Sequence, residues 1–191
     1  MLQGLGINTM PIVAGCIAID KGAIWEYFPK CDVLCPHCTM IMKLRDHALR
    51  ILKRSGGEKD YVRIPRFQCN NESCPVKVIR VLPEELTPYK HYTTPTIEDA
   101  LDDKLDEEET RTEDGTFSPS AKAVSCWHKW ISKNETFING FLKSVGFRYL
   151  GYGVELLKST LHILEKLRAA GPGWLSIIQR IIYSSGSRLT P

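Results

Sequence analysis

The stretch "CDVLCPHC", residues 31–38, places three cysteines and a histidine within eight residues. Within it, Cys35-Pro-His-Cys38 has the CxxC spacing of a metal-binding knuckle, and Cys69 and Cys74 follow about thirty residues later in "CNNESC". Two turn-borne pairs from the ends of a β-hairpin supply the four soft ligands that tetrahedral zinc prefers. We therefore expect one structural Zn2+ held by Cys35, Cys38, Cys69 and Cys74, with no open position for catalysis.

The cysteine pattern leaves alternatives open. The second pair is separated by four residues, against two in the first pair, and the four thiols could also be unmetallated core residues. Cys31 could replace Cys35, although a spacing of three intervening residues makes a poorer knuckle. His37 lies between two ligands and is expected to point away from the metal. Cys16 and Cys126 are expected to be buried thiols, because their surroundings are apolar or helical.

The order of residue patterns predicts the α+β class: a small N-terminal β zinc ribbon followed by an all-α, helix-turn-helix-like region. β-leaning runs such as "YVRIPRFQC" and "VKVIRVL" surround the cysteine pairs, and the Gly56–Gly57 pair supplies a hairpin-like turn. The predicted segments are an N-terminal strand and arm at 1–30, the zinc ribbon at 31–82, a proline-rich connector at 83–94, the helix-turn-helix-like region at 95–135 with an acidic loop at 106–118, and C-terminal helices at 136–191.

Helix signals begin after the connector. Thr94 is expected to cap a helix that starts at Pro95 and runs to about residue 106. Ser118–Pro119 repeats this signature before a helix predicted over 119–132, whose apolar face includes Trp127 and Trp130. Two further helices are predicted over 136–150 and 152–169, and a strand over Pro11–Ile19.

Charge is strongly segregated behind a formal net charge of +3. The balance is +6 over residues 30–80, −8 over 98–114 and +7 over 115–191. Two basic blocks around an acidic hinge favour a polyanionic partner, although solvated helix faces would give the same pattern. No stretch reads as a membrane span, and seven cysteines without a secretory signal favour a reducing cytoplasm. We expect a cytoplasmic, nucleoid-associated protein with no membrane partner.

An enzyme is not expected. The His-x-Glu partner of a zinc deaminase is missing ahead of "LCPHC", and phosphate-binding glycine loops, nucleophile elbows and His-Glu-x-x-His motifs are also missing. The ten acidic residues of 98–114 could supply the paired carboxylates of a metal-dependent nuclease, but such an acidic run is more often a solvent-exposed segment.

Double-stranded DNA is the partner that these patterns favour. Small polar and cationic side chains on the helix from Pro119 suit a major groove, and the ribbon offers arginines to phosphates. The candidate DNA-binding residues are Ser120, Lys122, Ser125, His128 and Lys129 of that helix, and Arg45, Arg54, Arg63 and Arg66 of the ribbon. An ordinary amphipathic helix whose tryptophans anchor a bundle would explain the same stretch.

Several segments together carry a family resemblance: "CPHC", "RIPRFQCNNESC", "VLPEELTPYKHYTTPTIEDAL" and "FSPSAKAVSCWHKWI". They resemble an uncharacterised bacterial family that joins a zinc ribbon to a transposase-type helix-turn-helix, and the short DNA-binding reading frame of certain insertion sequences. The resemblance covers about residues 20–135. It implies DNA binding in transposition or in regulation of a mobile element, possible contact with a transposase or recombinase, the zinc roles of the four cysteines, and a recognition helix at 120–130.

Two further partner hypotheses remain from the residues. Val154, Leu157, Leu161, Leu164 and Leu167 form an apolar stripe, so that 152–169 could be core or the seam of a homodimer. Alternatively, the chain could be a protein-interaction adaptor that docks a recombinase or polymerase subunit.

Overall fold

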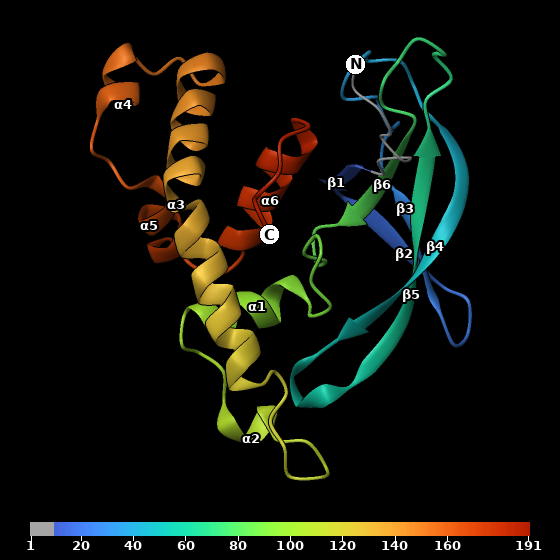
Figure 1. Cartoon of the computed structure of the whole chain (residues 1–191), viewed down its shortest axis with the longest axis vertical. Helices are drawn as coiled ribbons and strands as arrows, with labels where there is room; N and C mark the ends of the chain where they lie inside the picture. The colour runs from blue at the N-terminus through green and yellow to red at the C-terminus, as the bar shows by residue number, and fades with distance from the viewer. Residues whose placement is uncertain (1–9) are drawn as a thin grey trace, which may run out of the picture.

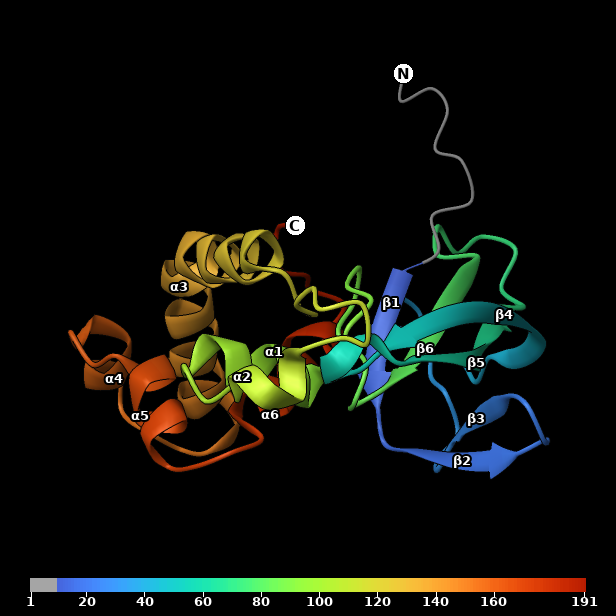
Figure 2. The same cartoon turned by 90° about the horizontal axis from the view of Figure 1, so that it is seen from below.

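The computed structural model describes residues 10–191, which form a curled β-sheet beside a group of helices (Figure 1). The fold is therefore mixed α+β, in the chain order predicted from the sequence. Seen at 90° to the first view, the helices occupy one side of the molecule and the strands the other (Figure 2). The first nine residues of the predicted N-terminal arm lie outside the described residues.

One sheet contains all six strands of the described chain. They are β1 Met10–Ala14, β2 Cys16–Asp20, β3 Trp25–Pro29, β4 Lys43–Lys53, β5 Lys59–Gln68 and β6 Val78–Pro83. Strand β5 organises the sheet, because β4 pairs along its whole length on one edge. The other edge of β5 is shared: β3 pairs with its first half and β6 with its second. Strand β1 then extends the sheet in parallel with β6.

The single strand predicted over Pro11–Ile19 is wrong. Gly15 divides that stretch into β1 and β2, which pair with different partners, β6 and β3. The hairpin predicted at the two glycines is confirmed: a short 3-10 turn, Ser55–Gly57, joins the antiparallel β4 and β5. Gly56 and Gly57 both adopt positive φ, a conformation that glycine reaches without steric cost.

The helices of the described chain differ from the predicted ones in length and number. They are α1 Thr94–Leu101, α2 Glu107–Thr110, α3 Ala121–Tyr149, α4 Val154–Lys158, α5 Ile163–Ala169 and α6 Trp174–Ser184. Thr93, not Thr94, caps α1 by accepting a hydrogen bond from the backbone N–H of Thr96 at 3.2 Å.

Two predicted helix boundaries are wrong. The helices expected at 119–132 and 136–150 form one continuous α3, because residues 133–135 contain no helix breaker. The helix expected at 152–169 is broken into α4 and α5. At the break Asn139 accepts a hydrogen bond from the backbone N–H of Leu164 at 3.0 Å, which satisfies a free donor at the start of α5. None of the helices in residues 10–191 is both long and apolar enough to span a bilayer.

Two apolar clusters lie on opposite faces of the sheet. The larger one joins the sheet to the helices and includes Ile64, Leu82, Trp127 and Ile178. The smaller one surrounds the cysteine loops and includes Val33, Met42, Phe67, Cys35, Cys69, Cys74, Ile79 and Val81. Strand β6 contributes to both clusters, because successive side chains point to opposite faces. It therefore couples the cysteine loops to the helical half.

Glu98 of α1 and Asp102, the C-cap residue of α1, bind the C-terminal helices. Glu98, which is 4% exposed, accepts hydrogen bonds from the backbone N–H groups of Gly173 and Leu175 at the start of α6. Asp102 accepts from Arg168 at 2.7 Å and from the indole of Trp174 at 3.1 Å. Burial disfavours the Asp102 carboxylate, but these hydrogen bonds outweigh it and hold its pKa below the usual value. Part of the acidic block is therefore structural and not a solvated surface.

Candidate metal centre

Four cysteine side chains converge from the β3–β4 loop and the β5–β6 loop. The Sγ atoms of Cys35 and Cys74 lie 3.6 Å apart, and those of Cys38 and Cys69 lie 3.5 Å apart. All four sulfur atoms lie within 4.8 Å of one another. In a tetrahedral site with Zn–S bonds of about 2.3 Å, neighbouring sulfurs are about 3.8 Å apart. The four cysteines predicted from the spacing therefore form a cluster that could hold one metal ion.

Backbone hydrogen bonds shape the first cysteine loop. The N–H of Cys35 donates to the carbonyl of Met40, and the N–H of Thr39 donates to the carbonyl of Cys35, both at 2.9 Å. Thr39 takes a φ of +57°, which turns the chain directly after Cys38. These contacts close the loop tightly, so that both thiols point to the same side.

The second loop is longer but equally well ordered by hydrogen bonds. The N–H of Cys69 donates to Lys77, and the N–H of Cys74 donates to Asn71, each at 3.0 Å. The side chain of Asn71 also accepts from the N–H of Ser73 at 3.0 Å, which is an Asx turn. The two additional residues in this pair are absorbed by that turn, so the wider spacing still brings both sulfurs to the cluster.

The pKa values of Cys38, Cys69 and Cys74 are shifted in different directions. A hydrogen bond from the backbone of Met40 lowers the pKa of Cys38 to about 7. Burial raises the pKa of Cys74 to about 12 and also raises the pKa of Cys69. Metal ions bind the thiolate form, so metal binding must release protons from this cluster. Affinity for a metal should consequently fall as the pH falls.

His37 was expected to point away from the cluster, and this expectation is wrong. Its Nδ1 lies 3.7 Å from the Sγ of Cys74. In the tautomer with a proton on Nδ1, the ring can donate to that sulfur and favour its thiolate form. Cys31 is exposed and lies outside the four-cysteine cluster. Cys16 is half-buried, whereas Cys126 is exposed on α3, contrary to the expectation of a buried thiol.

The arginines of the predicted DNA-binding set each lie beside a carboxylate. Arg66 binds both carboxylate oxygens of Asp46, and Arg45 lies 3.5 Å from the same group. Arg54 pairs with Asp60 at 3.0 Å, and Arg63 lies 3.8 Å from Glu26. The charge of these arginines is therefore partly balanced within the protein. Arg63 and Arg66 pair with carboxylates on other strands, so their balance could not be read from neighbouring residues.

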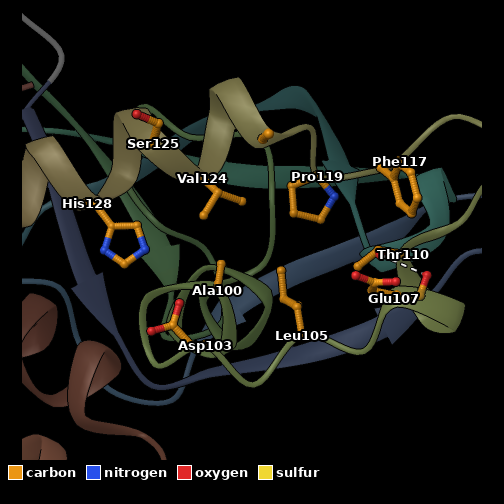
Figure 3. A pocket seen from close by; sticks show the side chains of 11 residues that line it. Ala100, Asp103, Leu105, Glu107, Thr110, Phe117, Pro119, Val124, Ser125 and His128 are labelled. Carbon is orange, nitrogen blue, oxygen red and sulfur yellow. Dashed lines mark hydrogen bonds between the residues drawn. The ribbon is translucent and has the colours of Figure 1, made fainter.

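Helix α3 distributes its predicted DNA-binding residues over two surfaces. Ser120 caps the helix by accepting a hydrogen bond from Ala123 at 3.4 Å. Ser125 and His128 line a cavity of about 790 Å³ between α3 and the α1–α2 segment, where Asp103 and Glu107 lie on the opposite wall (Figure 3). Lys122 and Lys129 are exposed and form no ion pair within residues 10–191.

A second group with metal-binding side chains lies at the surface. Glu135, His162 and Glu165 bring one ligand atom each to within 4.8 Å of one another. Nδ1 of His162 lies 3.6 Å from Glu135, and both side chains are well exposed. The contact is a surface ion pair when the histidine is protonated, so the buried cysteine cluster remains the stronger candidate centre.

Comparison with known proteins adds one family match. Residues 35–119 match a family model described as "Domain of unknown function (DUF6431)", which is less than half of the chain. The matched segment begins at Cys35 and contains all four clustered cysteines, the connector and α1. No curated protein and no solved structure matches the chain.

Proposed function

We propose that the protein is a non-enzymatic zinc-ribbon DNA-binding protein, associated with a bacterial mobile element as a transposition accessory or a regulator. The observation that carries the proposal is the pair of exposed lysines, Lys122 and Lys129, on the outer face of α3. Long-range steering by such unpaired cations attracts a polyanion. The resemblance of residues 20–135 to insertion-sequence DNA-binding proteins supports the same conclusion.

Zinc is the metal that the cluster chemistry favours. Four thiolates suit soft or borderline ions, and a four-sulfur set leaves no coordination position for water or substrate. The ion would therefore stabilise the two cysteine loops and take no part in hydrolysis. A zinc content of one per chain, determined after thiol modification, would support this assignment, whereas none would refute it.

Helix α3 is the proposed recognition element of a helix-turn-helix-like unit. Its inner face buries Trp127, Trp130 and Ile131 against the core, which leaves the lysine-bearing face in solvent. Helix α1 packs against α3, as the first helix of such a unit would. The connection between them contains α2 and is longer than the usual turn of about 3–4 residues.

The ribbon arginines would provide secondary contacts in this proposal. The side chains of Arg54 and Arg63 are 54% and 50% exposed, so a phosphate can reach them despite their neighbouring carboxylates. Arg66 is held by both oxygens of Asp46 and is 29% exposed, which makes it the least available of the four. Surface ion pairs of this kind are weak, at about 0–1 kcal/mol, so competition by phosphate is feasible.

Fluorescence anisotropy with a labelled duplex at several salt concentrations tests DNA binding. The logarithm of the binding constant should fall linearly with the logarithm of salt, by about 0.9 for each phosphate contacted. Lys122→Ala and Lys129→Ala should each reduce that slope by about one. Lys158→Ala, an exposed lysine on α4, is the matched control and should leave the slope unchanged. Salt-independent binding, or equal slopes in all variants, would refute the role of α3.

Selection of bound duplexes from a random pool tests the link to a mobile element. Enrichment of a sequence that recurs at the ends of an element carrying this gene would support the link. Enrichment of an unrelated promoter-like site, or no enrichment, would refute the link to a mobile element. The salt experiment would still decide whether the protein binds DNA.

A protein-interaction adaptor is the second candidate function, because several large apolar side chains are exposed at the end of α3 and on α4. Tyr149, Leu150 and Tyr152, at the end of α3, are 77%, 69% and 58% exposed. Val154 and Leu157 of α4 are also exposed, whereas Leu164 of α5 is buried. A concentrated apolar patch of this kind favours protein contacts, including a homodimer or a recombinase or polymerase subunit. Sedimentation of Leu150→Lys beside the natural protein would test self-association.

A further inference from the structure

A cavity of about 560 Å³ lies between the sheet and the connector that follows β6. Its lining includes Arg50 from β4, Arg80 from β6, and Tyr89, Lys90 and His91 from the connector. No aspartate or glutamate lines it. A concave site lined by two arginines, a lysine and a histidine, with no carboxylate residue, has the composition of an anion site.

Strand register explains why Arg80 lacks a partner. Arg80 lies opposite Arg66 across the β5–β6 pair, so both side chains share one face of the sheet. Asp46, which lies opposite Arg66 on β4, binds Arg66 through both carboxylate oxygens. The Nε of Arg80 is buried and has no hydrogen-bond partner within residues 10–191. Because Arg80 also lines the cavity, an anion bound there would pair with a guanidinium group that has no partner among the described residues.

Arg50 adds a second positive charge that is held in place. It donates hydrogen bonds to the carbonyl oxygens of Thr87, at 2.8 Å, and Lys90, which fix the connector over the sheet. Burial, and then the nearby charge of Arg80, lower the pKa of Arg50 to about 10. The guanidinium still carries its charge at neutral pH. It is therefore a fixed cation beside a second cation, and neither is neutralised by the protein.

The carboxylates nearest in sequence are occupied elsewhere. Glu84 pairs with Arg180 at 3.1 Å, and Glu85 accepts a hydrogen bond from Tyr27. Residues 1–9 contain no aspartate or glutamate, so every acid of the chain lies within the described residues. Lys90, whose ammonium lies 4.9 Å from the ring centre of Trp130, also forms no ion pair there.

We propose that this cavity binds a phosphate group, which Arg80 contacts directly while Arg50 and Lys90 supply fixed positive charge. Guanidinium groups match the geometry of phosphate oxygens and bind them through paired hydrogen bonds. The phosphate could come from a free nucleotide or from a nucleic-acid backbone. Binding of phosphate here does not depend on the proposed DNA contact of α3, because the site lies on different residues.

Tyr89 marks the rim of the cavity. It is 56% exposed and adopts a φ of +64°, in the left-handed region that non-glycine residues seldom occupy. Its exposed ring offers a surface on which the base of a nucleotide can stack. A nucleotide should consequently bind more tightly than inorganic phosphate, and Tyr89→Ala should remove that difference.

Titration of the full chain with inorganic phosphate tests the proposal. Ionic strength is kept constant with chloride, and the Nε–Hε resonances of the arginines are followed by NMR. The Arg80 resonance should shift in a saturable manner. Arg80→Met should weaken phosphate binding by about tenfold or more, as for loss of a charge-assisted hydrogen bond. Arg148→Met, an exposed arginine in the last turn of α3, is the control for charge removal and should bind as the natural protein does.

The outcomes separate this proposal from that of DNA binding. No saturable shift at Arg80, or equal binding in Arg80→Met with native-like spectra, would show that ordinary water satisfies the guanidinium and would overturn the proposal. Adenosine monophosphate and a short duplex are then added in competition with phosphate. Displacement by the nucleotide alone assigns a free nucleotide as the source, and displacement by the duplex assigns the backbone. If the cavity binds phosphate while the separate salt titrations detect no duplex binding, only the proposed DNA function is refuted.

Discussion

Replacing Cys69 by serine should release the metal and unfold both cysteine loops, while the helical half stays folded. Cys69 is 5% exposed, and its sulfur lies 3.5 Å from that of Cys38, so serine removes one corner of the cluster. Structural zinc contributes about 10–16 kcal/mol in small modules. The whole folding free energy of a typical domain is only about 5–15 kcal/mol. The small core around the loops therefore cannot compensate for the lost ligand.

The division of the core into two apolar clusters predicts which segments of Cys69→Ser unfold and which stay folded. The buried apolar residues of 31–42 and 69–77 belong to the smaller apolar cluster, whereas α3 and α6 contribute Trp127 and Ile178 to the larger one. Amide protection should fall in the two loops and persist in α3 and α6. Strand β6 contributes to both clusters, so its protection should fall to an intermediate level.

Hydrogen exchange read by mass spectrometry, together with zinc quantification, provides the assay. Cys126→Ser is the matched control, because Cys126 is exposed and lies outside the cluster. Cys126→Ser should retain one zinc per chain and the same amide protection as the unsubstituted protein. If Cys69→Ser retained its zinc and its loop protection, the four-cysteine centre would be wrong. If chelation left the protection of the natural protein unchanged, a structural role for the metal would be wrong.

Three further predictions concern single side chains. Glu98→Ala removes two charge-assisted hydrogen bonds at the start of α6, so urea titration should show a free energy of unfolding lower by about 3–6 kcal/mol. The control Glu107→Ala, at an exposed position, should change the free energy of unfolding little. A loss below about 1 kcal/mol in Glu98→Ala would contradict the capping role. Asp102→Asn should destabilise the protein at neutral pH. Because the pKa of Asp102 is lowered in the folded state, the difference should begin to shrink only as the pH falls to the ordinary aspartate pKa of about 4, and it should vanish only below the lowered pKa. A difference that does not shrink below about pH 4 would argue against this role. His37→Ala should weaken zinc binding about 10–100-fold in a chelator competition, since it removes a ring nitrogen beside Cys74, and unchanged affinity would assign that contact no role.

Local spacing was sufficient to predict the four-cysteine cluster. A CxxC pair and a second cysteine pair about thirty residues later constrain which thiols can meet, because each pair lies in one turn. The α+β class and the β4–β5 hairpin were also predictable, from apolar alternation and from Gly56–Gly57. Helix boundaries were less predictable, because Asn139, far from the break in sequence, accepts a hydrogen bond from Leu164 in the first turn of α5.

Tertiary structure alone decided which charges are available. Composition marks all basic residues alike, but strand register places Asp46 against Arg66 and leaves Arg80 without an acceptor. The packing of α1 against the C-terminal helices likewise makes Glu98 and Asp102 hydrogen-bond acceptors for those helices, although the sequence pattern predicts solvated acids there. Ligand spacing within a turn is a local property that the sequence alone determines. Charge pairing depends on contacts between residues distant along the chain, and these exist only once the sheet and helices have packed.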